Sequence, residues 1–495
     1  MKCHFDTDQA DQPASQKSRT RMPASISTRF VSRWAPVCPP EGTWTSNFEG
    51  LCSNSLPHPL RTRFNVDSYI WQAAAAPPPW SPQELGCEVL AWLYIMLCRS
   101  FRALSLLSFG VASISAASQN YTGNAEAAFQ VLQAWYNTNT GIWNTTGWWN
   151  SANCLTVIGD LAAVDPSVKA QVSAVYANTI VAAANLNLGV SKFVLPDYNI
   201  ETLYTNPKPG IVSRQANPKG FLNGFYDDEG WWALGWIQAY DVTGTAEYLD
   251  EAIDIFMDMK NGSTTPCHGG IWWDKAETYV NAIANELYLS VAAHLANRVP
   301  QNRTFYLSIA ESQWNWFQQS GMINSKSLIN DGLTSACKNN NGTVWSYNQG
   351  VILGALVELN KASPNTTYIS TAKSIATAAI KDLSDSNGVL HDPCEPNCGA
   401  DGSQFKGIFM RNLQILQAAS PDKSYLSFIA TNAASIWAKD RNAANQLSVD
   451  WAGPFVGSAN ASTQSSALDA LVAAAAFQEQ LGNGIASRRR GRLWQ

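Results

Sequence analysis

The sequence predicts an all-α protein built as an (α/α)6 barrel, in which six inner helices are ringed by six outer helices. Three observations support this fold class. From residue 123 onward, apolar residues recur every three or four positions, which is typical of helices with one buried face. Clusters of Gly, Pro and Asn interrupt this periodicity and mark off twelve helices in consecutive pairs. Hydrophobic residues make up 46% of the chain, which suffices for a large core.

Proline marks several of the expected helix starts, because its fixed φ suits the first turn. Pro166, Pro300 and Pro421 each stand at or just before such a start. Two Ala-rich segments, 277–297 and 461–479, are apolar on wide faces, as central helices should be. A bundle or an α-solenoid would give the same series of helices, although no motif repeats at a fixed period. The expected helices are 123–138, 148–163, 166–187, 228–243, 245–260, 278–297, 301–320, 346–361, 364–385, 404–418, 421–440 and 461–482.

Four long irregular stretches separate these helices. Loops of this length in a compact domain usually serve a function. In a barrel they would gather at one mouth and line a cleft. They cover residues 188–227, 261–277, 321–345 and 440–460.

Charge and hydropathy exclude several classes of protein. The chain has 495 residues, with 33 Lys and Arg against 38 Asp and Glu, so its net charge is −5. A nucleic-acid-binding surface of clustered Lys and Arg is therefore not expected. The chain contains no apolar run of 18 residues, which excludes a multi-span membrane protein. Trp is frequent, with 20 residues, and its ring can stack on a sugar.

Residues 1–95 differ from the rest of the chain. Residues 1–87 are rich in Pro, Ser, Arg and Thr and lack periodicity, as in linkers and disordered segments. We expect this part to be disordered, or to be an erroneous extension of a protein that starts at Met96. The alternative is a cytoplasmic tail before a signal anchor, because residues 89–97 are also apolar. Arg99 separates that run from the next, and neither run alone spans a bilayer.

Residues 96–117 have the pattern of a secretory signal peptide. Two arginines precede an apolar run at 103–112, and Ser115 and Ala117 stand at positions −3 and −1 of a cleavage site. The chain ends without a hydrophobic tail, so we expect no lipid-anchor signal. The expected domains are the extension 1–95, the signal peptide 96–117, the helical catalytic domain 118–485 and a basic tail 486–495.

Cysteines and glycosylation sequons agree with the secretory pathway. Five cysteines follow residue 117, which allows two disulfides and one free thiol. Cys394 and Cys398 could close a small loop, and Cys267 and Cys337 flank elements that could meet, but sequence alone leaves the connectivity open. We expect a glycoprotein that is secreted or held in the cell wall. The sequon asparagines are Asn120, Asn144, Asn261, Asn302, Asn341, Asn365 and Asn460.

Neither a metal nor a cofactor is expected. His391, Cys394 and Cys398 would supply three zinc ligands, but no fourth stands at a zinc-like spacing. The sequence has no Gly-x-Gly-x-x-Gly, no phosphate loop and no serine nucleophile elbow.

The most informative segment begins at an expected helix start with Asp227, Asp228 and Glu229. Acidic residues there often only cap the helix and complement its dipole. Glycoside hydrolysis, however, needs two carboxyl groups, one to attack the sugar or activate water and one to protonate the leaving oxygen. At a helix entry both side chains can reach one cleft. The like charge of one carboxylate would then raise the pKa of the other and keep it protonated.

Residues 226–232 resemble the paired-aspartate signature of glycoside hydrolase family 76, the endo-α-1,6-mannanases. Four further segments fit this family in its own order, and the resemblance covers residues 120–482. It implies an (α/α)6 barrel and a retaining two-step mechanism, with Asp227 matching the nucleophile and Asp228 the general acid/base. The four segments are 147–153, 267–273 with 281–286, 347–350, and 405–411.

Aromatic and amide side chains in these segments are candidates for sugar contacts. Core packing, helix capping and buried hydrogen bonding are the alternative explanations for them. Val280 departs from the family, where a Lys often precedes the residue matching Asn281, so affinity at one subsite is expected to differ. Lys406 and Arg411 are expected to brace the structure. The candidates are Trp149, Asn150, Asn153, Tyr226, Trp231, Trp232, Trp272, Trp273, Asn281, Asn348 and Gln349.

The resemblance implies a monomeric, endo-acting hydrolase of α-1,6-mannosidic linkages in mannan. A cell-wall transglycosylase of the same family, acting on mannose-containing anchor glycans, is the nearest alternative, because both reactions pass through one covalent intermediate. A mannan-binding protein without activity is the alternative from a different class. It would keep the tryptophans but would not need the aspartate pair.

Overall fold

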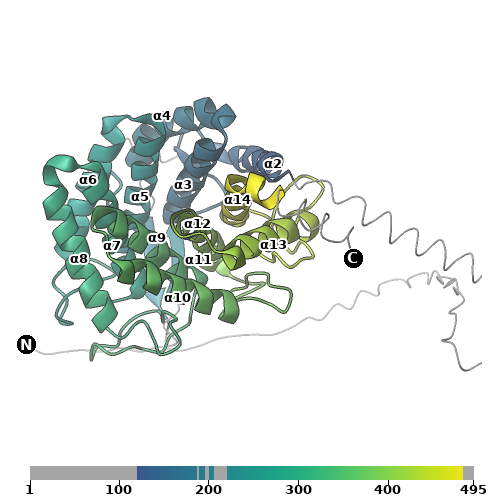
Figure 1. Ribbon diagram of the computed structural model, residues 1–495. Helices are drawn as coiled ribbons and strands as arrows, with labels where there is room; N and C mark the ends of the chain where they lie inside the picture. The colour runs from purple at the N-terminus through teal and green to yellow at the C-terminus, as the bar shows by residue number, and fades with distance from the viewer. Residues whose placement is uncertain (1–119, 187–188, 196–199, 206–219, 483–495) are drawn as a thin grey trace, which may run out of the picture. The chain divides into compact units, whose positions relative to one another are not determined.

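The structure is a computed structural model that describes residues 120–186, 189–195, 200–205 and 220–482 (Figure 1). The expected extension, signal peptide and basic tail therefore lie outside the described residues. Within these ranges the fold contains twelve helices of 13 residues or more, and each overlaps one of the twelve expected from the sequence. The helices form the predicted (α/α)6 barrel.

Six helices form a closed inner ring. Each packs against the next, and the last packs against the first. Because they have neighbours on most sides, most of their residues are buried, including polar ones. The inner helices are α3 (Trp148–Val164), α5 (Tyr226–Thr243), α7 (Ala282–Arg298), α9 (Ser346–Ala362), α12 (Phe405–Ala419) and α14 (Ala461–Ala476).

Six outer helices alternate with the inner ones along the chain and bury one face each (Figure 1). The first of them, α2, packs against the last inner helix, α14, so the two ends of the described domain meet. The outer helices are α2 (Tyr121–Gln133), α4 (Lys169–Leu186), α6 (Ala246–Met259), α8 (Arg303–Gln319), α10 (Thr366–Asp382) and α13 (Lys423–Lys439).

Two prolines set helix starts differently from the prediction. Pro166 and Pro300 begin single 3₁₀ turns, Pro166–Val168 and Pro300–Asn302, and the α-helices follow at Lys169 and Arg303. Proline fits the first turn, where no intrahelical N–H bond is lost, and a tight 3₁₀ turn often opens a helix. A further short helix, α11 (Gly399–Gly402), precedes α12.

Two β-hairpins interrupt the helical pattern. The small one joins β1 (Tyr136–Asn137) to β2 (Ile142–Trp143). The larger one pairs β3 (Gly189–Val194) with β4 (Ile200–Thr205) in antiparallel register. The prediction of an irregular stretch over 188–227 was wrong for this part. Both strands are rich in β-branched and aromatic residues, which favour strands over loops.

The disulfides resolve the connectivity that the sequence left open. Cys267 bonds to Cys337, 70 residues later, and Cys394 bonds to Cys398. Cys154 is buried as a free thiol. None of the described helices is long and apolar enough to cross a membrane.

Close approach of inner helices depends on glycine, as at the crossing of α9 and α12. A Cβ added to Gly350 of α9 would lie 2.6 Å from the Cα of Phe409 in α12, closer than real contacts allow. Gly235 of α5 is different, because its nearest contacts would be an ordinary 3.4 Å.

We predict that Gly350→Ala lowers the free energy of unfolding by about 1–3 kcal/mol, since the added methyl group forces two backbones apart. Gly235→Ala is the matched control within an inner helix. Alanine favours the helix by about 1 kcal/mol, so this variant should be neutral or slightly stabilised. Denaturant unfolding of both variants tests this difference, and equal stabilities would contradict it.

Candidate active site

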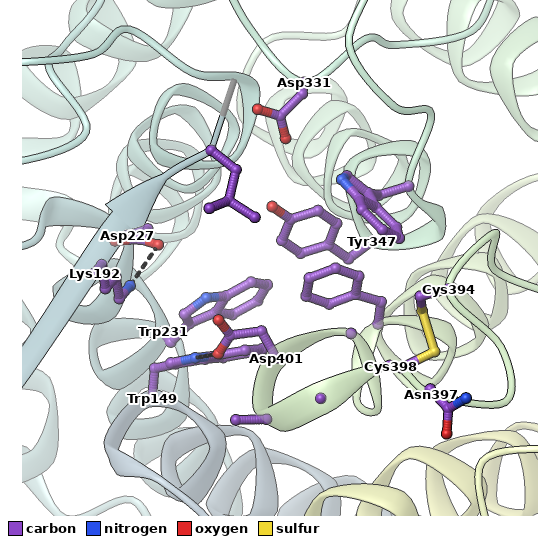
Figure 2. Close-up of a pocket in the computed structure, with 16 residues that line it drawn as sticks. Trp149, Lys192, Asp227, Trp231, Asp331, Tyr347, Cys394, Asn397, Cys398 and Asp401 are labelled. Carbon is purple, nitrogen blue, oxygen red and sulfur yellow. Dashed lines mark hydrogen bonds and ion pairs between the residues drawn. A yellow bond between two sulfur atoms is a disulfide. The ribbon is translucent and has the colours of Figure 1, made fainter. Parts of the chain in front are cut away.

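A cavity of about 370 Å³ opens where inner helices begin (Figure 2). Trp149, Asp227 and Tyr347 are the second residues of α3, α5 and α9, and Phe405 is the first residue of α12. The N-termini of four inner helices therefore converge on it, and their dipoles favour negative charge there. The wall is completed by Lys192, Leu195, Asp331, Trp345 and the loop 394–402.

Asp227 and Asp228 stand in the first turn of α5. The turn begins in extended backbone at Phe225, and the Tyr226 N–H donates to the Trp273 carbonyl at 2.9 Å, which fixes the helix entry. Asp227 lines the cavity and is 6% exposed, whereas Asp228 is fully buried beside it. Asn223 Nδ2 donates to Asp228 Oδ2 at 2.7 Å.

Lys192 of β3 binds both carboxylates. Its Nζ lies 2.9 Å from Asp227 Oδ2 and 2.5 Å from Asp228 Oδ1, and its side chain is 2% exposed. Burial lowers the pKa of Lys192, but the two aspartates raise it further, so the amine is held charged. Because one nitrogen contacts both groups, the two carboxylate oxygens are no further apart than the sum of these distances.

Burial sets the protonation of Asp228. It raises the pKa of this carboxyl to about 6; the charge on Lys192 opposes the rise and the charge on Asp227 adds to it. Asp228 therefore exchanges its proton at mildly acidic pH, where an ordinary aspartate would be ionised.

Glu229, the third acid of the segment, does not belong to the pair. Its Oε1 receives Lys275 Nζ at 2.6 Å and the backbone N–H of Asn223 at 3.1 Å. Lys275 also pairs with Asp258 at 2.5 Å, on α6. Glu229 thus ties α5 to Lys275 and to the segment before the helix, which is a bracing role rather than the helix cap that the sequence suggested.

Aromatic rings form one side of the cavity. Trp149 stacks on Trp231 with ring centres 5.7 Å apart, and Tyr347 stacks on Phe405 at 3.8 Å. Trp149 Nε1 donates to Asp401 Oδ1 at 2.8 Å, which fixes the indole against α11. Such flat, rigid faces can bind the apolar face of a sugar ring.

A further carboxylate, that of Asp331, lies across the cavity from Asp227 (Figure 2). Asp331 is 2% exposed and receives the Tyr279 hydroxyl on Oδ2 at 2.6 Å. Asn340 Nδ2 donates to the same hydroxyl at 2.8 Å. This chain of bonds orients the Asp331 carboxylate, an acceptor suited to sugar hydroxyls.

Two of the eleven candidates for sugar contact, Trp149 and Trp231, line the cavity. The structure places the other nine elsewhere. Three of these are tryptophans: Trp232 packs in the core against Trp148, Trp273 packs against Phe225, and the Trp272 indole donates to Thr264. Tyr226 lies under the Lys275 ammonium, 5.5 Å from its ring.

The polar candidates are buried inside the barrel, and all but one of them make hydrogen bonds there. Asn150 donates to Gln404, and Asn153 accepts from Arg411. Asn281 caps α7 by accepting from the Ala284 N–H. Gln349 bonds both backbone groups of Ile329. Asn348 is fully buried and, within the described structure, neither of its amide atoms has a hydrogen-bond partner.

The sequence analysis did not single out most of the cavity residues as site residues, and six of those it missed are aromatic or charged. Tyr347 and Phe405 stand at inner-helix starts, so the rule that placed Asp227 would have found them. Asp331 and Trp345 lie on loops, Asp401 on the short helix α11 and Lys192 on the larger hairpin, and no local pattern marks them.

The expected bracing role of Lys406 and Arg411 agrees with their contacts. Lys406 Nζ is 2% exposed and binds Glu395 at 2.7 Å and the Val449 carbonyl. Arg411 lies 3.6 Å from Asp469. Among the residues that the structure describes, no cluster of His, Cys, Asp or Glu is suited to hold a metal ion.

Comparisons with known proteins point to the same family as the sequence motifs. The family model for glycosyl hydrolase family 76 matches residues 211–483. The mannan endo-1,6-alpha-mannosidase DFG5 of Candida albicans is 25% identical over 230 residues, 43% of this chain and 50% of that protein. The mannan endo-1,6-alpha-mannosidase DCW1 of the same organism is 27% identical over 216 residues, 39% of this chain and 47% of that protein. The chain thus spans about half the length of the curated relatives it matches.

Solved structures share the fold. One is an inactive variant of the alpha-1,6-mannanase GH76A of Salegentibacter sp. HEL1_6, with two consecutive aspartates replaced by alanine, in complex with alpha-1,6-mannotetrose. It is 19% identical, with a TM-score of 0.58, and the match covers 72% of this chain and 98% of that one.

We predict that Lys192→Met raises the pKa of Asp228 above its value of about 6. Lys192 holds that pKa down, so removing its charge favours the protonated carboxyl. A ¹³C NMR titration of labelled aspartate carboxyls measures the change, with Asp228→Asn identifying the signal. Lys326→Met, which removes an exposed lysine, should leave the midpoint unchanged. An unaltered midpoint in Lys192→Met would show that the ion pair does not govern this proton.

Proposed function

Because the chain belongs to glycosyl hydrolase family 76, we propose that it is an endo-acting hydrolase of α-1,6-mannosidic linkages in mannan, working with retention of configuration. The observation that carries the proposal is the pair Asp227 and Asp228, brought within reach of one ammonium group at an aromatic-walled cavity. The names of the curated relatives and the mannotetrose complex of the structural neighbour support the substrate class.

Asp227 is proposed as the nucleophile. It borders the cavity and can reach a sugar bound there. One of its oxygens attacks the anomeric carbon as the bond to the leaving oxygen breaks, which gives a covalent mannosyl-enzyme. The spacing of the two carboxylate oxygens supports this route, since retaining enzymes hold their carboxyl groups about 5–5.5 Å apart.

Asp228 is proposed as the acid and base. Its raised pKa lets it carry a proton at mildly acidic pH and give it to the departing oxygen. In the second step it takes a proton from water, whose oxygen attacks the anomeric carbon and releases Asp227. Two displacements at one carbon restore the original configuration. If a sugar hydroxyl replaces water, the same site performs transfer, the alternative reaction.

Lys192 limits when this chemistry can start. Its ammonium lies between the two carboxylates, where the reacting sugar must bind. The proposed mechanism therefore requires the lysine to withdraw from Asp228 as substrate enters.

Secretion is part of the proposal, because the sequons are accessible. Six of the seven sequon asparagines are exposed, and Asn460 is partly exposed. Asn120, Asn365 and Asn460 cap helices through their side-chain oxygens. Their amide nitrogens, where a glycan attaches, take no part in those caps.

We predict that Asp227→Asn and Asp228→Asn each lower turnover of α-1,6-mannan by about 10²–10⁴-fold while the protein stays folded. Glu247→Gln is the control, since it removes an exposed acid from the first turn of outer helix α6 that does not line the cavity. Circular dichroism checks the folding of each variant. Near-normal turnover in both aspartate variants would refute the assignment.

The stereochemistry gives an independent prediction. The first-formed product should carry the α configuration, because each displacement inverts the anomeric carbon once. Proton NMR during the first minutes of reaction reads this out, and an initial β-mannose signal would exclude the retaining route. Adding an acceptor oligosaccharide to the same reaction separates hydrolysis from transfer by the size of the products.

A further inference from the structure

Asn223 stands just before α5 and contacts the carboxyl group proposed as the general acid and base. Its Nδ2 donates to Asp228 Oδ2 at 2.7 Å. Its own Oδ1 accepts the backbone N–H of Phe225 at 2.8 Å, which closes an Asx turn. Lys192 Nζ binds the other oxygen of Asp228, Oδ1, at 2.5 Å. The two oxygens of this fully buried carboxyl group therefore have different partners.

The backbone around Asn223 is fixed to the first turn of α5. The Asn223 N–H donates to Glu229 Oε1 at 3.1 Å, and the Gly224 carbonyl accepts the backbone N–H of Lys275 at 2.9 Å. The side chain of Lys275 binds the same Glu229 oxygen at 2.6 Å. The Asn223 side chain thus leaves the chain from a fixed position relative to the helix.

The turn at Phe225 decides which way the Asn223 amide points. A side-chain amide has an oxygen that accepts and a nitrogen that only donates. If the amide turned over, its nitrogen would face the Phe225 N–H, and two donors would meet without an acceptor. The oxygen therefore stays on Phe225, and the nitrogen stays on Asp228.

This donor determines which oxygen of Asp228 carries a proton. A proton on Oδ2 would displace or weaken the Asn223 hydrogen bond, because the amide nitrogen cannot accept. A proton on Oδ1 leaves that bond intact. Oδ1 is also the oxygen that shares the Lys192 ammonium with Asp227, and both of these residues line the cavity.

We propose that Asn223 is a positioning residue that confines the transferable proton of Asp228 to Oδ1, the oxygen beside the cavity. The inference rests on the proposed role of Asp228 as general acid and base. When Lys192 withdraws, Oδ1 carries the proton, and its O–H bond breaks as the hydrogen passes to the departing oxygen. In the second step Oδ1 takes a hydrogen from water. Oδ2 remains bound to Asn223 throughout, so one oxygen serves both transfers.

The charged groups around Asp228 fix the direction of the expected pH effect. Burial raises the pKa of Asp228 to about 6; Lys192 of β3 opposes the rise, Asp227 of the same helix turn adds to it, and the hydrogen bond from Asn223 opposes it. Glu229, the next acid in the turn, is bound to Lys275. Loss of the Asn223 donor should therefore raise the pKa of Asp228 further.

The test is Asn223→Asp, which keeps the shape of the side chain. Its carboxylate still accepts the Phe225 N–H, so the turn is kept, but it cannot donate to Asp228. The new charge draws the proton of Asp228 onto Oδ2, away from the sugar. kcat should fall by about tenfold to hundredfold, with KM changing far less. The basic limb of the pH dependence of kcat/KM should move to higher pH, because a neighbouring carboxylate keeps Asp228 protonated.

Asn442→Asp is the matched control. Asn442 Oδ1 likewise accepts the N–H of the residue two positions later, Ala444, at 2.9 Å, and its Nδ2 donates to Gln446 Oε1 at 2.8 Å. Asn442 does not line the cavity, so its variant should keep the wild-type kcat and pH profile. A wild-type kcat in Asn223→Asp, or a loss confined to KM, would overturn the positioning role, since a role in the turn alone survives this substitution.

A second measurement does not depend on turnover. In protein with ¹³C-labelled aspartate, the Asp228 carboxyl signal is identified by its absence in Asp228→Asn, and its titration midpoint is compared between wild type and Asn223→Ala. The midpoint should rise by about 0.5–1 pH unit, and an equal or lower midpoint overturns the inference. If Asn223→Ala does not fold, as circular dichroism shows, the Asn223→Asp kinetics decide.

The two measurements separate this inference from the proposed function. If the wild-type protein fails to cleave α-1,6-mannan while the midpoint rises in Asn223→Ala, the proposed function falls and the control of Asp228 by Asn223 stands. If the wild-type protein cleaves α-1,6-mannan and the midpoint does not rise, the proposed function stands and the inference falls.

Discussion

Closure of the inner ring is the constraint on which the rest of the molecule depends. Each inner helix is covered on most sides, so its polar side chains must be paired within the barrel or directed to its open end. The first and last parts of the domain complete the ring. Gln478 Oε1 accepts from the backbone and the hydroxyl of Thr122, 356 residues earlier. A local site at the helix starts therefore exists only when the whole domain has folded.

Inside the barrel, buried charged side chains are held by polar partners. Arg411 lies between Asn153 and Asp469, and Lys406 joins Glu395 to the Val449 carbonyl. Burial raises the pKa of Asp469 to about 7, although Arg411 opposes the rise. At the open end of the barrel, burial likewise raises the pKa of Asp228. Burial moves its proton exchange toward neutrality, which a general acid requires.

The helices and the acid pair were predictable from sequence because their signals are local. Periodicity located all twelve helices, and neighbouring positions guaranteed that Asp227 and Asp228 would lie close together. The other residues that line the cavity could not be predicted from local signals. An inner helix is buried around most of its circumference, so its pattern does not distinguish Trp231, on the cavity, from Trp232, in the core. Asp331 and Lys192 reach the site from a loop and a hairpin, whose paths depend on tertiary packing.

The disulfide between Cys267 and Cys337 links the stability of the domain to the redox conditions in which it folds. It closes a segment of 70 residues that contains all of α7 and α8 and also Asp331, which lines the cavity. Chain-entropy arguments give a closed loop of this length about 4 kcal/mol of stabilisation, by restricting the unfolded state. That amount is a large share of the net stability of an ordinary domain. A chain folding in a reducing compartment would lack it, so the complete domain is suited to an oxidising one.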